Sequence, residues 1–135
     1  MFDVEVCQAR HVVLVRFRGL LSEDDFSQLD KLGADARSGP AFDCIFDLSA
    51  VERVDLATDF VVKRGDIPQA FKDRERIYVV PQDDLKLLVR FYAAAQAAKG
   101  WKAPDVVASI DEALSRLGVD ASDFAALPGR PPTDT

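Results

Sequence analysis

The sequence predicts one α/β domain in which helices pack against a five-stranded mixed sheet, with the element order ββαβαβαβα. Two apolar–polar alternating runs at the start of the chain indicate an antiparallel hairpin. After the hairpin, helical patterns alternate with short apolar runs, which is typical of βαβ units with parallel strands. Because no internal repeat or linker-like segment interrupts this order, we expect a single domain.

The hairpin is predicted at residues 3–8 and 11–18, and Gly19 is expected to end its second strand. Its apolar residues recur at the two-residue period of a strand: Val4, Val6, Val13, Val15 and Phe17.

A first helix is predicted to follow. Ser22 suits the N-cap, and Asp25 stands three positions later in an acidic first turn that favours the helix dipole. The apolar stripe of this helix is Phe26, Leu29, Leu32 and Ala36, and the run Ser38-Gly39-Pro40 ends it.

The third strand is predicted at 43–48, followed by a loop and by a second helix that Asp55 caps. Its inward face is expected to hold Leu56, Phe60 and Val61, with a break near Arg64 and a short turn through Phe71.

The remaining elements are a strand at 76–80, a long helix from Asp83 or Asp84 to about Lys99, a strand at 106–110 and a helix at 111–118. The domain is therefore predicted to span residues 1–118. Residues 119–135 are expected to form a largely disordered tail, with at most one turn at 122–127.

Composition limits the function classes. The chain is 48% hydrophobic and 30% charged, values typical of a globular protein, and its net charge of −6 disfavours nucleic-acid binding. The sequence has no run of 18 apolar residues, so it predicts no membrane span. With no recognisable leader peptide, we expect a cytoplasmic protein in which Cys7 and Cys44 are free thiols.

The run from Phe46 to Phe60 carries a family resemblance. Asp47-Leu48-Ser49, a variable loop and then Asp55 resemble the strand–loop–helix motif of the STAS domain, the fold of the SpoIIAA-like anti-sigma-factor antagonists. In that family the second Asp is followed by Ser, Ser/Thr and Gly, and the first of these serines is phosphorylated. Here Leu56 stands at that position, and leucine cannot accept a phosphoryl group.

The resemblance extends in pattern over roughly residues 3–118. It implies a protein partner that contacts four residues: Ser49, Asp55, Leu56 and Thr58. Thr58 replaces the family's Gly, which is expected to alter docking at the helix start. The alternatives from the residues alone are that Ser49 satisfies backbone groups in a loop and that Asp55 is only an N-cap.

Catalytic and metal sites are not predicted. The chain has one histidine, His11, and no Cys–His or Ser–His pair with supporting spacing. Its paired acids, such as Asp83-Asp84, fall in first turns of helices, where the helix dipole accounts for them. We therefore expect no catalytic residue, no cofactor and no metal.

The long helix has an unusually wide apolar face. Projected at ~100° per residue, its apolar side chains cover an arc of about 200°, whereas one packed face needs little more than about 100°. Leu87 and Phe91 fall outside the face centred on Leu85, Leu88 and Tyr92. They are predicted either to be deeply buried under neighbouring segments or to contact a second copy, a partner or a lipid.

Two functions follow as hypotheses, with an enzyme of unrecognised site as a weaker third. The first is a non-enzymatic STAS-like protein-binding module without the phosphorylation switch. The second is a carrier of a small apolar or lipid-like ligand, because the fold group also resembles the CRAL-TRIO lipid-transfer domain. Its pocket is expected between sheet and helices, lined by Phe60, Phe71, Tyr78, Phe91 and Trp101.

Overall fold

A computed structural model describes residues 1–36, 38–71 and 73–127. Its strands are β1 (Phe2–Cys7), β2 (Val12–Ser22), β3 (Asp43–Asp55), β4 (Arg76–Val79), β5 (Asp105–Val107) and β6 (Ala125–Ala126). Its helices are α1 (Glu23–Ala36), α2 (Thr58–Arg64), α3 (Asp83–Ala98) and α4 (Ile110–Leu117), and a 3₁₀ turn spans Ala121–Asp123.

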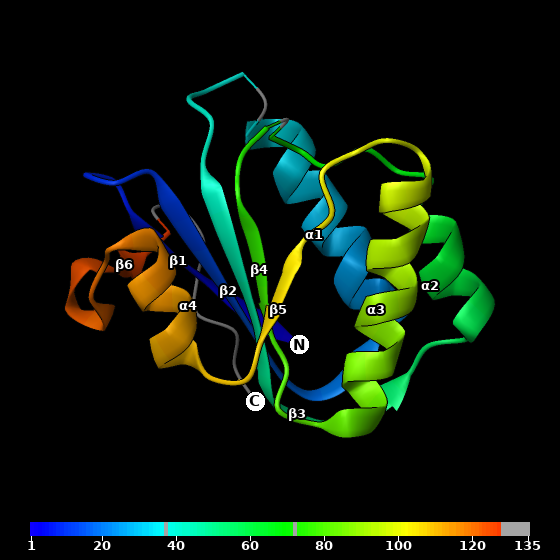
Figure 1. The fold of residues 1–135 in the computed structure, drawn as a ribbon. Coiled ribbons are helices and arrows are strands. Elements are labelled where there is room, and N and C mark those ends of the chain that lie inside the picture. The colour runs from blue at the N-terminus through cyan, green and yellow to red at the C-terminus, as the bar shows by residue number, and fades with distance from the viewer. Residues whose placement is uncertain (37, 72, 128–135) are drawn as a thin grey trace.

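The strands form one mixed sheet in the order β5-β4-β3-β2-β1-β6. β2 to β5 pair in parallel, whereas β1 pairs antiparallel with both β2 and β6. α1, α2 and α3 cover one face of the sheet and α4 covers the other (Figure 1). The predicted α/β fold with an N-terminal hairpin is confirmed, and the sheet has six strands rather than the predicted five.

Strand alternation divides the core into two clusters, one on each face of the sheet. On the α4 face, Ile77 and Val79 pack in a cluster that includes Leu114. The intervening residues Arg76 and Tyr78 point to the face that carries three helices, where each contacts Tyr92 of α3. That face therefore receives polar side chains from a strand that is otherwise apolar.

The C-terminal ends of β2 and β3 are longer than predicted. Gly19 has a φ of 66° and lies at a register shift, so β2 continues to Ser22 instead of ending at Gly19. β3 runs beside it to Asp55, which pairs with Ser22. The loop predicted at 49–54 and the N-cap predicted at Asp55 are therefore wrong, and α2 begins at Thr58 after Ala57 as N-cap.

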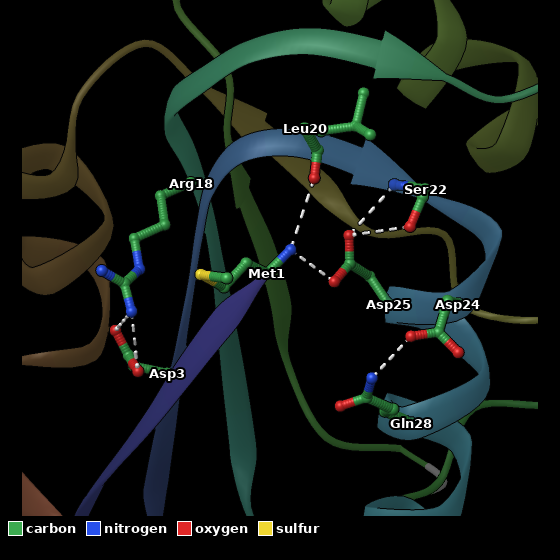
Figure 2. Close-up of polar contacts among 8 residues, drawn as sticks. All are labelled: Met1, Asp3, Arg18, Leu20, Ser22, Asp24, Asp25 and Gln28. Atoms are coloured by element: carbon green, nitrogen blue, oxygen red, sulfur yellow. Dashed lines mark hydrogen bonds and ion pairs between the residues drawn. The ribbon is translucent and has the colours of Figure 1, made fainter. Parts of the chain in front are cut away.

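Ser22 directly precedes α1, as predicted for its cap, and the hydrogen bond that fixes this start runs from Ser22 to a buried carboxylate (Figure 2). Asp25 is 4% exposed and accepts a 3.0 Å hydrogen bond from the backbone N–H of Ser22. Its other oxygen lies 2.5 Å from the amino group of Met1, whose charge compensates the buried anion. The first turn of α1 is thereby joined to the start of β1.

α2 and α3 cross at close range. Gly65, the C-cap of α2, is buried, and a Cβ built on it would lie 2.2 Å from the Cβ of Ala95. Gln96 is fully buried and donates hydrogen bonds to the carbonyls of Gly65 at 2.8 Å and Ile67 at 3.0 Å. These bonds hold the chain after Arg64 against α3, so that residues 67–71 form bends instead of the predicted turn.

The later elements shift by a few residues from their predicted bounds. Gln82, not Asp83 or Asp84, is the N-cap of α3. The β5 strand ends at Val107 because Ser109 caps α4, its hydroxyl accepting from the N–H of Glu112 at 3.2 Å.

Residues 119–127, which the sequence analysis assigned to the tail, are packed against the domain. Val119 is 7% exposed in the α4-face cluster, and Phe124 packs beside it. β6 pairs with the outer edge of β1, and the N–H of Leu127 bonds to Val4 O at 3.1 Å. An apolar run beside an unpaired strand edge accounts for this ordering. Residues 128–135 lie outside the described residues.

We predict that Gly65→Ala destabilises the fold by ~1–3 kcal/mol, because the added methyl group overpacks the contact between α2 and α3. Denaturant unfolding measures the change. Gly39→Ala is the matched control, since its Cβ would meet nothing closer than 3.6 Å. Equal losses of stability in the two variants would show that the helix contact relaxes freely.

Candidate functional site

A cavity of about 580 Å³ lies between the three-helix face of the sheet, α1 and the segment between α2 and β4. We call it the sheet–α1 cavity. Its apolar walls come from the strands and from α1, and include Val4, Val13, Val15, Phe46, Leu29 and Leu32. Its rim lies at the N-terminal ends of β3 and β4, where the rings of Phe42 and Phe71 approach to 6.0 Å. Cavities of 300–1,000 Å³ are typical of small-molecule sites.

Two of the three arginines in the cavity wall have carboxylate partners. Arg64, at the end of α2, makes hydrogen bonds of 2.8 and 3.0 Å to Asp30 of α1, and its guanidinium lies 4.7 Å from the Phe26 ring centre. Burial opposes its charge, but the Asp30 contacts outweigh burial and raise the pKa of Arg64. Arg74 Nε lies 3.0 Å from an oxygen of Asp43.

The third arginine, Arg76, has only neutral partners among the residues that the structure describes. It is 7% exposed and donates to the Tyr92 hydroxyl at 2.7 Å, Gln96 Oε1 at 3.1 Å and the Lys102 carbonyl at 2.6 Å. No described carboxylate lies within ion-pair distance of it. A buried, permanently charged group without a counter-ion is costly, so this arginine is the most unusual feature of the cavity.

The thiol of Cys44 and the phenol of Tyr78 also line the cavity. Burial raises the pKa of Cys44 to about 12, and the nearby charge of Arg76 offsets only part of the increase. Burial likewise raises the pKa of Tyr78. Both groups are therefore neutral near pH 7. In the described part of the chain the Tyr78 hydroxyl has no hydrogen-bond partner.

The residues predicted to contact a partner lie in two places. Asp55, Leu56 and Thr58 lie within four residues at the junction of β3 and α2, where Asp55 and Thr58 are exposed and Leu56 is half-buried against the core. Ser49 is six residues back along β3, roughly 20 Å away at strand spacing. Its hydroxyl donates to Asp47 at 2.6 Å.

Two exposed apolar side chains accompany Asp55 at this end of the sheet. Leu20 of β2 is 41% exposed and Val54 of β3 is 36% exposed. Leu20 is paired in register with Arg53 and Leu21 with Val54, so Leu20 and Val54 lie on adjacent strands but their side chains leave this end of the sheet on opposite faces. We name the surface of Leu20, Val54, Asp55 and Thr58 the tip surface. Sequence reasoning missed Leu20 and Val54 because it ended both strands earlier.

Leu87 and Phe91 of α3 are 54% and 42% exposed, whereas Leu85 and Val89 are buried. The prediction that Leu87 and Phe91 are deeply buried is therefore wrong. The alternative, that these two residues form an interface, stays a prediction.

The aromatic lining predicted for a ligand pocket is right for two of its five residues. Phe71 and Tyr78 line the sheet–α1 cavity. Phe60 instead borders a gap of about 40 Å³ between α2 and α3. Phe91 and Trp101 are exposed, and neither lines the cavity.

Sequence reasoning did not place any of the three arginines in a cavity wall. Arg76 gave a usable signal, since a charged residue occupies an alternate position in a buried strand. Among the described residues, no three His, Cys, Asp or Glu side chains gather as metal ligands would. None of the helices within those residues is long and apolar enough to cross a bilayer.

The raised pKa of Cys44 predicts a loss of stability in alkali. The folded-state value of about 12 lies above the ordinary value of 9.0, so the stabilisation is complete below pH 9 and is lost as the pH rises towards 12. Urea unfolding from pH 8 to pH 11 should show a shallower decline for Cys44→Ala than for the wild type. Identical pH profiles would contradict the burial of this thiol.

Comparisons with known proteins identify the fold. No protein-family model and no curated protein matches the sequence. Among solved structures, the anti-sigma factor antagonist SpoIIAA in its unphosphorylated form matches with a TM-score of 0.58 and 18% identity, over 87% of this chain and 98% of that one.

A DUF3478-family protein of SpoIIAA-like fold from Shewanella loihica PV-4 matches with a TM-score of 0.56 and 18% identity, over 87% of this chain and 92% of that one. The agreement covers nearly the whole of both solved chains. This chain therefore has the SpoIIAA-like (STAS) fold that residues 47–55 suggested.

Proposed function

We propose that the chain is a non-enzymatic, cytoplasmic regulatory module that binds a protein partner through the tip surface. The observation that carries the proposal is the exposure of Leu20 and Val54 beside Asp55 and Thr58. Each face of this strand end thus exposes one apolar side chain beside polar groups, and exposed apolar side chains with polar neighbours are typical of protein-binding surfaces. The fold of the antagonist SpoIIAA supports a regulatory role of this kind.

The proposed module lacks the phosphorylation switch. Leu56 has no hydroxyl group, and its side chain packs against the core cluster that includes Leu48 and Leu85. A phosphoryl group at this position would require both another residue and a different side-chain environment. Binding at the tip surface is therefore independent of modification at position 56. Ser49 lies too far along β3 to belong to the same contact.

We predict that Leu20→Lys combined with Val54→Lys weakens partner binding at least tenfold, because both substitutions place charge in the apolar part of the contact. Quantitative cross-linking identifies the partner, and titration with that purified partner gives the affinity. Val62→Lys is the control, since Val62 is 44% exposed on α2 outside the tip surface. Unchanged affinity in the double variant would contradict the proposed surface.

A second candidate function is that of a small-molecule carrier, and the sheet–α1 cavity specifically favours it. Its volume of about 580 Å³ fits a small ligand, and its walls are largely apolar. Native mass spectrometry of the purified chain tests for a retained molecule. The two functions are compatible, because the cavity rim and the tip surface lie at opposite ends of β3.

We also propose that the chain forms a homodimer through Leu87 and Phe91. Covering two such side chains gains about 1.5–3 kcal/mol for each when burial is complete, and an antiparallel pair of α3 helices covers both copies of each. We predict that Leu87→Glu with Phe91→Glu yields a folded monomer in analytical ultracentrifugation. A wild-type chain that sediments as a monomer would exclude the dimer.

A further inference from the structure

We propose that the sheet–α1 cavity binds an amphipathic molecule with one carboxylate group. The carboxylate would contact Arg76 and Tyr78, and the apolar chain would extend along the strands towards α1. This inference rests on the carrier function proposed above and adds the chemistry of the ligand.

The charges of the cavity favour a single anion. Arg64 is paired with Asp30 and Arg74 with Asp43, so these two arginines are already compensated. Arg76 is buried and has three neutral acceptors, with no described carboxylate at ion-pair distance. One carboxylate would supply the missing charge. A second anionic group would have no cation left to pair with and would be buried at a cost.

Donors for a carboxylate are present on β4. Arginine has five N–H donors in a planar fork, and three of those of Arg76 have acceptors among the described residues. Tyr78 is two residues further along the strand, so it points to the same face, and its hydroxyl makes no hydrogen bond to a described residue. One of the two remaining N–H groups of Arg76 and the phenol of Tyr78 can donate to one carboxylate.

The remaining wall suits an aliphatic chain. Phe46, Val15 and Val13 follow from β4 across the sheet, and Leu29 and Leu32 of α1 face them. The neutral thiol of Cys44 adds no charge to this region. Each methylene group that enters such a wall should strengthen binding about fourfold. The cavity therefore distinguishes both the head and the length of its ligand.

Isothermal titration of the wild-type chain with decanoate and with decanol tests the head group without a mutation. We expect saturable 1:1 binding of both, with decanoate at least tenfold tighter, and octanoate weaker than decanoate. Equal affinity for decanoate and decanol would leave the carrier function standing and overturn the carboxylate inference. No binding of either would overturn both.

Variants locate the ligand. Tyr78→Phe removes a hydroxyl that the fold does not use, so it should weaken decanoate severalfold and leave decanol unchanged. Arg76→Gln should abolish the preference for decanoate, with its folding checked by circular dichroism. Arg53→Gln, an exposed arginine outside the cavity wall, is the matched control.

A cavity-filling variant completes the test, because Arg76→Gln removes structural hydrogen bonds and can impair folding. Val13→Trp should fill the cavity, keep the fold and abolish binding of both probes. If Val13→Trp and Tyr78→Phe both bind decanoate as the wild type does, the ligand lies elsewhere and the proposal is wrong.

Discussion

The hydrogen bonds of Arg76 and Gln96 hold together the part of the structure on which the cavity depends. Arg76, at the start of β4, donates to Tyr92 and Gln96 of α3, and Gln96 donates to the carbonyls of Gly65 and Ile67. The segment after α2 is thereby attached to α3 through its backbone carbonyls. Residues of the same segment, Ile67 among them, form one wall of the cavity. A segment held by its backbone carbonyls need not fill the space beside it with side chains, as an apolar core would.

The same network carries an electrostatic cost that Asp25 and Arg64 avoid. Asp25 is similarly buried, yet it lies against the charged amino group of Met1, and Arg64 is neutralised by Asp30. Arg76 is stabilised only by dipoles, which satisfy its hydrogen bonds without cancelling its charge. Cys44 and Tyr78 differ from Arg76 because they carry no charge: burial raises the pKa of each group, so each stays protonated. The cavity thus combines two weak acids that stay protonated with one cation that has no described counter-ion, and the proposed carboxylate ligand rests on this arrangement.

Local periodicity was sufficient to predict the hairpin, the parallel strands and the helices, because each pattern reflects which face of one element is buried. It failed where the outcome depends on a neighbour distant in sequence. β3 continues to Asp55 only because Gly19 lets β2 bend and run beside it, and β6 forms because β1 offers an edge. At the site, the sequence pattern showed that Arg76 and Tyr78 lie on the same face of β4. The pattern did not show that Gln96, 20 residues after Arg76, is the hydrogen-bond partner of that arginine. Phe91 and Trp101 are aromatic like true core residues, but Phe91 lies on the outer side of α3 and Trp101 follows the end of that helix, and residue type alone does not encode either placement.

α2 is one of the elements that the two proposed sites share, together with β2 and β3. Its first residue, Thr58, belongs to the tip surface, and its last, Arg64, lines the cavity and is bound to Asp30 of α1. Between them, Val61 is buried and Phe60 packs its ring 6.0 Å from that of Phe26, so the helix is anchored on its inner side. Because it has only seven residues and Gly65 fits closely against Ala95, its end has little room to move independently of α3. An influence of a cavity ligand on the tip surface would pass through this short helix or along β2 and β3, and it would act equally in both directions, since coupling between two binding equilibria is reciprocal.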